Sequence, residues 1–175
     1  MRFVQIKKYF EEIRGKYLMI ENRRQIKVRF SEIDSLGIAY NAAYYIWFEI
    51  GRFYFSEKIL GLNLQTILTK YRFPVIKSAC KYLYPIHFNE ELFLDTFVYY
   101  HETMSNIEFF YKLYNCDHKM CAIGVTSHLL VDEEGKMNFL MDNYLSEHMN
   151  TSRKKYQEYY LTEQERKKWL HKINR

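Results

Sequence analysis

The turn that precedes the longest apolar helix pattern carries the side chains best suited to chemistry. Asp34 lies in this turn, Gly37 follows it, and Asn41 opens the helix pattern. A carboxylate at such a position can serve as a general base or a nucleophile, and helix N–H groups can polarise a carbonyl oxygen. An Asp close to a Gly is more often an ordinary turn residue or a helix cap. The residues alone therefore leave a catalytic and a structural role for Asp34 both open.

Metal and cofactor chemistry find little support in the sequence. Cys116, His118 and Cys121 are close together, but no fourth ligand follows at a recognised spacing, and zinc sites need three or four arranged ligands. The three cysteines are an odd number without paired spacing, which argues against a disulfide framework. We therefore expect no metal and no cofactor. The strand histidines also lack partners at a defensible spacing: His87, His101 and His128.

The composition is that of one ordinary globular domain. The chain has 175 residues, of which 48% are hydrophobic and 27% charged. No apolar run approaches the 18 or so residues that a membrane span requires. Charged residues interrupt the first twenty positions, so a signal peptide is not expected and the cytoplasm is the predicted location.

Charge is distributed unevenly along the chain. Residues 1–29 contain nine Lys and Arg against three Glu, and residues 146–175 contain eight against four. The middle of the chain is net acidic. Basic ends can favour phosphates or membrane surfaces, but no nucleic-acid motif accompanies them, so solvated helix faces are the preferred interpretation.

Hydrophobic periodicity predicts the elements that must position Asp34 and Asn41. A helix is predicted over 3–18, a strand over 25–30, and a buried helix over 42–58 with Asn41 as its N-cap. Extended segments joined by short links follow, which indicates an antiparallel meander. Two helices are predicted in the tail, one capped by Ser152 and one opened by a Thr162–Glu165 capping box. The extended segments are 71–88, 91–100, 106–114 and 120–131.

Three motifs in this order resemble the hotdog-fold thioesterases. They are the stretch from Val28 to Glu49, which contains Asp-x-x-Gly and then Tyr-Asn, the strand Lys81 to Phe88, and the strand and turn Gly124 to Gly135. The chain is most similar to the 4-hydroxybenzoyl-CoA thioesterase group, which includes the Tol-Pal-associated (YbgC-like) acyl-CoA thioesterases. This resemblance implies an α+β hotdog domain over 25–145, with an antiparallel sheet wrapped around a long central helix. Helical extensions would occupy 1–24 and 146–175.

The resemblance also assigns roles to residues. It implies acyl-CoA hydrolysis with Asp34 as nucleophile or general base and the Asn41 backbone N–H as oxyanion donor. Glu49 would be a supporting group and the alternative carboxylate. Many relatives carry His where this chain has Asn41, which leaves acyl preference and pH response open. The remaining substrate-binding residues implied are Gly37, Ile38, Tyr40, Tyr44 and Tyr45. The family further implies a homodimer or a homotetramer.

Several alternatives remain at this stage. The substrate could be an acyl-carrier protein, or the chain could be a non-catalytic acyl-CoA-binding protein. A hotdog hydratase is disfavoured because no His lies between Met1 and Pro85. For the basic tail we favour packing against protein, then contact with the CoA phosphates, and then weak association with a membrane surface.

Overall fold

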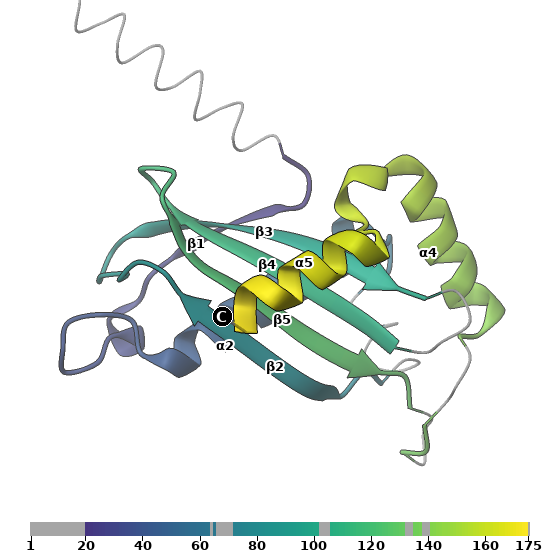
Figure 1. Ribbon diagram of the computed structural model, residues 1–175, viewed down its shortest axis with the longest axis horizontal. Helices are drawn as coiled ribbons and strands as arrows, with labels where there is room; N and C mark the ends of the chain where they lie inside the picture. The colour runs from purple at the N-terminus through teal and green to yellow at the C-terminus, as the bar shows by residue number, and fades with distance from the viewer. Residues whose placement is uncertain are drawn as a thin grey trace, which may run out of the picture.

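Five antiparallel strands form one sheet in the computed structural model, which describes residues 20–63, 65, 72–101, 106–131, 135–137 and 141–174. The order across the sheet is β1-β3-β4-β5-β2, so β1 and β2 are the edge strands (Figure 1). The predicted helix over 3–18 lies outside the described residues. The strands are β1 (Arg23–Lys27), β2 (Val75–Tyr82), β3 (Glu91–Tyr100), β4 (Asn106–Asn115) and β5 (Met120–Leu129).

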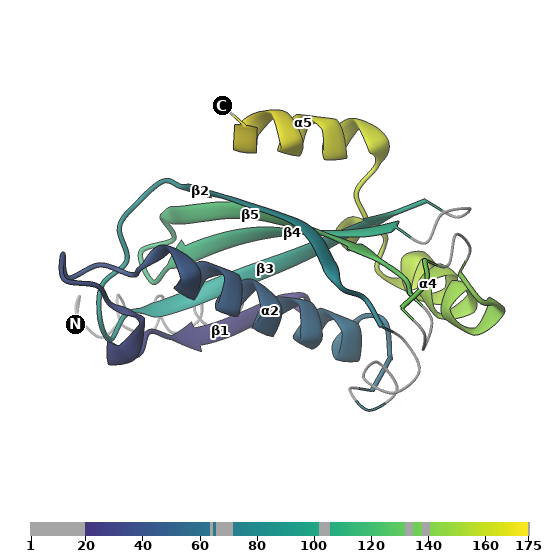
Figure 2. The ribbon, with the colours of Figure 1, turned by 90° about the horizontal axis from the view of Figure 1, so that it is seen from below.

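The sheet is covered on both faces. Helix α2 (Asn41–Lys58) runs along one face and helix α5 (Glu163–Asn174) crosses the other (Figure 2). The alternating patterns of β3 and β4 predict one buried face, and the side chains of that face are indeed buried under α2: Leu92, Leu94, Thr96, Val98, Ile107, Phe109, Tyr111 and Leu113. The opposite face is also closed, because Phe110, Ile123 and Val125 form a second apolar cluster with Ile173 of α5.

Helix α2 has the length that the sequence predicts. It buries one side against the sheet, while Ala42, Ile46 and Glu49 face away and are exposed. The expected enclosure of this helix by the sheet therefore stays a prediction for the assembled protein. The buried residues of the helix are Ala43, Tyr44, Trp47, Phe48, Gly51, Phe55 and Ser56.

A glycine on β5 lets α2 approach the sheet closely. A Cβ atom on Gly124 would lie 2.3 Å from the Phe48 ring, a separation that real Cβ atoms do not adopt. The Phe48 ring instead stacks on Tyr111 with a centroid distance of 4.4 Å. This contact sets the distance between α2 and the sheet, and with it the position of the first turn of the helix.

Three local predictions need correction. Tyr40, not Asn41, is the N-cap of α2, because its extended backbone accepts a hydrogen bond from the Ala43 N–H while Asn41 already has helical geometry. The first strand is β1 over 23–27, since the antiparallel register pairs Arg23 with Asp95. The extended segment predicted over 71–88 shortens to β2, which lies between Pro74 and Pro85.

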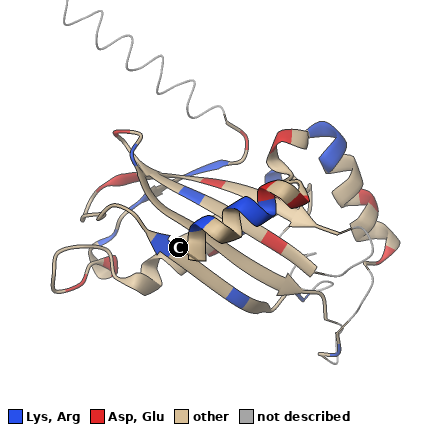
Figure 3. Cartoon of the chain, viewed as in Figure 1, with Lys and Arg blue, Asp and Glu red and all other residues tan. Residues whose placement is uncertain are grey.

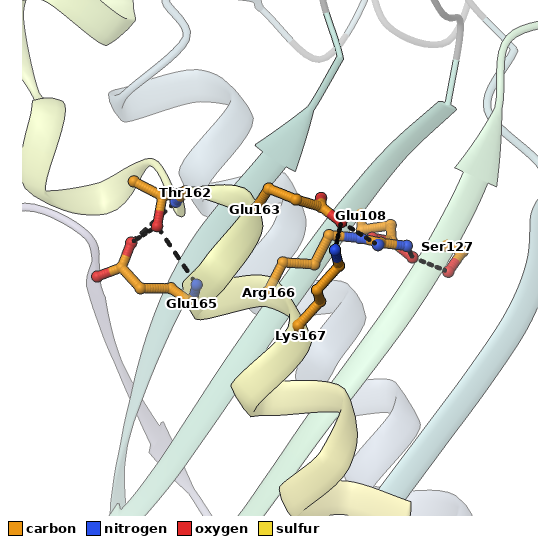
Figure 4. Close-up of polar contacts among 7 residues, drawn as sticks. All are labelled: Glu108, Ser127, Thr162, Glu163, Glu165, Arg166 and Lys167. Atoms are coloured by element: carbon orange, nitrogen blue, oxygen red, sulfur yellow. Dashed lines mark hydrogen bonds and ion pairs between the residues drawn. The ribbon is translucent and has the colours of Figure 1, made fainter.

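The tail folds as two helices that pack on the same chain. Helix α4 (Asn143–Lys155) is capped by Asp142, so the expectation for Ser152 was wrong: Ser152 lies inside the helix, and its hydroxyl donates to the Ile59 carbonyl at 2.7 Å. The capping box at Thr162 and Glu165 is confirmed by two reciprocal hydrogen bonds (Figure 4). A short 3-10 turn, η2 (Gln157–Tyr159), joins the two helices.

An ion pair between a buried carboxylate and a partly exposed guanidinium joins α5 to the outer face of the sheet. Glu108 of β4 accepts hydrogen bonds from the Arg166 guanidinium and, at 3.1 Å, from the Ser127 hydroxyl (Figure 4). The Trp169 ring packs beside Phe110. The helix is therefore packed against its own chain, the arrangement that the sequence favours for the tail. Lys167, Lys168 and Lys172 of this helix are exposed. Figure 3 marks the Lys and Arg positions along the chain.

None of the helices in the described part of the chain is long and apolar enough to cross a membrane.

Candidate active site

Asp34 sits in a tight reversal between η1 (Phe30–Glu32) and α2. Its N–H donates to the Ile38 carbonyl at 2.9 Å, and its carbonyl accepts from the Gly37 N–H at 3.0 Å. Gly37 has a φ of 77°, which a residue without a Cβ adopts without strain. One Asp34 carboxylate oxygen accepts from the Leu36 N–H at 2.8 Å, and the side chain remains partly accessible. The carboxylate is thus held in place by its own turn and still reaches solvent.

A neighbouring carboxylate ties this reversal to the helix. Glu32 is buried and accepts from the Arg29 backbone and guanidinium and from the Trp47 indole N–H, the last at 3.1 Å. Burial alone would raise the pKa of Glu32, but these hydrogen bonds outweigh burial and lower it. The Tyr40 N–H also donates to the Glu32 carbonyl. Glu32 therefore sets the position of the Asp34 turn relative to α2.

A pocket of about 410 Å³ opens at the start of α2. We call it the helix-start pocket. Ile38, Asn41 and Tyr44 contribute to its lining. The end of β2 and the segment that follows it supply further lining residues: Tyr82, Leu83, Tyr84 and Pro85. Unpaired N–H groups and the positive end of the helix dipole favour negative charge at such a position.

Hydroxyl and thiol groups cluster beside this pocket. The Tyr82 ring meets Tyr44 edge to face at 4.7 Å. Its hydroxyl also interacts with Tyr45 and Cys80, and burial together with these neighbours raises the pKa of Tyr82 to about 12. Burial raises the pKa of Cys80 to about 12 as well. These groups are therefore neutral hydrogen-bonding partners near pH 7 rather than nucleophiles.

Glu49 lies elsewhere on the same helix. It is eight residues beyond Asn41, which is about 12 Å along the helix axis. It lines a larger pocket of about 560 Å³, together with Arg52 and the start of β2. We call this the Arg52 pocket. The two pockets share no lining residue.

The structure thus separates the residues that the resemblance groups together. Ile38, Asn41 and Tyr44 line the helix-start pocket, and Asp34 and Gly37 form the turn beside it. Tyr40 is the helix cap, and Tyr45 points its ring toward Phe48. Glu49 belongs to the other pocket.

Two groups of functional interest carried no sequence signal. Glu32 is one residue among many Glu, and nothing in the spacing predicts its bond to Trp47. Arg52 is three residues beyond Glu49, a common helix spacing for a surface ion pair. Glu32 and Arg52 differ from most other described charged residues of the chain in how far the fold buries them, which the sequence does not show.

Comparisons with known proteins agree with this geometry. Residues 28–164 match the Thioesterase-like superfamily. The YneP protein of Bacillus subtilis (strain 168), described as a candidate acyl-CoA thioesterase, is 26% identical over 113 residues, covering 65% of this chain and 81% of that protein.

Solved structures share the fold at low sequence identity. The DHNA-CoA thioesterase from Staphylococcus aureus has a TM-score of 0.68 and 21% identity, covering 77% of this chain and 89% of that one. The protein SAV2348 from Staphylococcus aureus, solved in complex with CoA, has a TM-score of 0.66 and 15% identity, covering 80% and 85%. The fold is therefore that of the hotdog thioesterases. The match spans most of the chain, from the residue after β1 to the first turn of α5, and the chain belongs to the Thioesterase-like superfamily of thioester hydrolases.

Proposed function

We propose that this protein hydrolyses acyl-CoA thioesters, within the 4-hydroxybenzoyl-CoA thioesterase group, and that Asp34 is its catalytic carboxylate. The observation that carries the proposal is the Asp34 turn, fixed by Glu32 beside a pocket at the start of α2. A water-accessible carboxylate next to helix N–H groups is suited to acyl transfer.

In the proposed reaction, the Asn41 backbone N–H and the positive end of α2 stabilise negative charge on the thioester oxygen. Asp34 either removes a proton from the attacking water or attacks the carbonyl carbon itself and forms an anhydride that water then opens. In both routes the carbon–sulfur bond breaks and the thiol of CoA leaves with a proton. Asn41 contributes its backbone, so the absence of a His side chain at this position does not remove the donor.

We further propose that the site is completed in a dimer joined through β2. This edge strand exposes Val75 and Ile76, and unpaired sheet edges invite pairing. Antiparallel pairing of two β2 strands sets the start of one strand beside the end of the other. The helix-start pocket borders the end of β2, and the Arg52 pocket borders its start. The helix-start pocket of one subunit would then adjoin the Arg52 pocket of its partner, and the sheet of the pair would enclose both α2 helices.

An assay of purified protein with a panel of acyl-CoAs and acyl-carrier-protein thioesters tests this proposal. Release of free thiol from CoA substrates is the expected result. Activity with the carrier-protein thioesters alone would move the assignment to that substrate class. Binding without turnover of any thioester would favour a non-catalytic acyl-CoA-binding protein.

A further inference from the structure

The Arg52 pocket is apolar apart from a few charged groups. Its described walls include the side chains of Phe53, Leu62, Phe73, Phe109, Val131 and Leu145. Two guanidinium groups, Arg52 and Arg72, and one carboxylate, Glu49, are the charged side chains among its described lining residues. The pocket thus combines a mostly apolar surface with a small number of charged side chains.

Arg52 lines this pocket, and its positive charge is only weakly neutralised by Glu49. Its side chain is only 14% exposed, while that of Glu49 is 54% exposed. The Arg52 Nη2 and Glu49 Oε1 atoms are 3.8 Å apart, which is too long for a hydrogen bond. A guanidinium withdrawn from water gains most from a close, two-pronged carboxylate. Glu49 does not provide that contact.

Neutral polar groups lie next to Arg52. The Tyr111 hydroxyl and the Thr126 hydroxyl are 2.8 Å apart, and His128 Nε2 lies 2.9 Å from the same Thr126 oxygen. Burial lowers the pKa of His128 to about 4, and the charge of Arg52 adds to this shift. His128 is therefore uncharged near neutral pH. These polar groups lie next to Arg52, and Tyr111 can hydrogen-bond to it, but they supply no negative charge.

We infer that the Arg52 pocket binds an acyl group whose far end carries a carboxylate, so that thioesters of dicarboxylic acids are the preferred substrates. This inference rests on the proposed function. The apolar walls would cover the methylene chain, and the terminal carboxylate would pair with the Arg52 guanidinium. Glu49 is exposed enough to turn toward water when the second carboxylate arrives.

Binding of non-hydrolysable CoA thioethers, measured by calorimetry, tests the inference without turnover. Three probes of equal chain length end in a carboxylate, a hydroxyl or a methyl group. We expect the carboxylate probe to bind at least about tenfold more tightly than either of the others, the usual range for a charged hydrogen-bonded contact. Equal or tighter binding of the methyl or hydroxyl probe would overturn the inference.

Variants locate the effect. Arg52→Gln should remove the preference for the carboxylate probe, and Arg52→Lys should retain part of it. Lys58→Gln, a matched loss of charge on the same helix outside the pocket, should leave it intact. A preference that survives in Arg52→Gln would contradict the assignment. If that variant fails to fold, the three probes on the wild-type protein still decide.

Turnover separates this inference from the proposed function. Hydrolysis of plain and carboxylated acyl-CoAs at equal efficiency would leave the function standing and overturn the inference. Selective binding of the carboxylate probe without hydrolysis of any thioester would support the pocket and overturn the function.

Discussion

Asp34 is the residue on which the proposed chemistry depends most directly. Asp34→Asn keeps the size of the side chain and the oxygen that accepts from the Leu36 N–H. It removes the charge that a base or nucleophile requires. We expect the variant to fold normally and to lose at least about 10²-fold in kcat, because general acid–base groups typically contribute 10² to 10⁴.

The matched control is Glu49→Gln, the same change at the other carboxylate of α2. Steady-state kinetics with a good acyl-CoA substrate compare the two variants, and circular dichroism checks their folding. Full turnover in Asp34→Asn together with inactivity in Glu49→Gln would transfer the catalytic role to Glu49.

Glu32 gives a prediction about stability rather than turnover. Glu32→Leu removes a buried carboxylate that accepts from four nitrogen donors, and leaves the Trp47 indole N–H without its partner. We expect a loss of roughly 2–4 kcal/mol in the free energy of unfolding, because buried polar groups left unpaired are costly. Urea denaturation measures it. A loss below about 0.5 kcal/mol would mean that Glu32 does not fix the turn.

His128 gives a pH dependence whose sign can be worked out. Its pKa is about 4 in the folded protein against 6.5 for an ordinary His. Between these values the unfolded chain binds a proton that the folded chain does not, so stability falls as pH drops from about 6.5 to 4, by about 3 kcal/mol at most. Thermal melts of wild type and His128→Asn should show a steeper pH slope in the wild type over this range. Parallel slopes would contradict the prediction.

At the scale of single residues, the sequence predicts the Asp34 turn better than it predicts the contacts that hold this turn against α2. Asp-x-x-Gly before an apolar helix indicates the reversal that the structure contains. The bond from Trp47 to Glu32 joins residues fifteen positions apart, and it exists only because the chain reverses in between. No local pattern records such a contact.

Among the elements, α5 and the sheet are joined by a pair of charges that can be separated by mutation. Arg166→Met leaves Glu108 buried and charged, with the Ser127 hydroxyl as its remaining side-chain donor in the described part of the chain. The double variant Arg166→Met with Glu108→Gln removes that uncompensated charge. We expect the single variant to be destabilised by about 1–3 kcal/mol, less than for a fully buried pair because Arg166 is partly exposed, and the double variant to recover part of this loss. Strict additivity in the denaturation free energies would show that the pair is not coupled.

The contact between α2 and β5 gives a second element-scale prediction. Gly124→Ala places a methyl group against the Phe48 ring, which must shift although it is stacked on Tyr111. Overpacking of this kind costs about 1–3 kcal/mol. Phe48→Leu in the same chain should restore part of the melting temperature that Gly124→Ala removes. An unchanged melting temperature in Gly124→Ala would show that the helix is free to lift.

The sequence predicts these elements more reliably than their docking. Strands β3 and β4 follow from alternation, β5 follows from a long apolar run, and α5 follows from its capping box. Trp169, Leu170 and Ile173 form a narrow apolar face on α5. From the sequence alone, this face could contact the same chain, a partner subunit or a membrane surface. Its place on the outer face depends on Glu108, whose burial on a strand is not visible in the sequence. For the same reason, alternation in the strands predicts that the outer face of the sheet is exposed to solvent, whereas in the structure α5 covers part of this face.

At the scale of the whole molecule, the exposed β2 edge predicts a dimer. Ile76 is 54% exposed on this strand. Replacing it with Lys places charge on an edge that would otherwise pair, a change that natural edge strands use to stay apart. We expect Ile76→Lys to shift the protein from dimer to monomer in light scattering and to lose thioesterase activity in parallel. Full activity in a clean monomer would show that one subunit is sufficient.

Mixing two inactive variants tests whether the site is shared between subunits. In the proposed dimer, Asp34 of one subunit works beside the Arg52 pocket of its partner. One variant carries Asp34→Asn, and the other carries Leu60→Trp, which fills the Arg52 pocket while leaving the Asp34 turn unaltered. If each is inactive alone, subunit exchange should rebuild one wild-type site in every mixed dimer. Random exchange makes half of the dimers mixed, so about a quarter of the wild-type activity should return. When both changes are placed in the same chain, co-refolding with wild type should leave no intact site in the mixed dimers, because each shared site then contains one altered component, whereas an unshared site would leave one intact site per mixed dimer. A mixture that remains as inactive as its separate parts, despite demonstrated exchange, would show that Asp34 and the Arg52 pocket serve the same subunit.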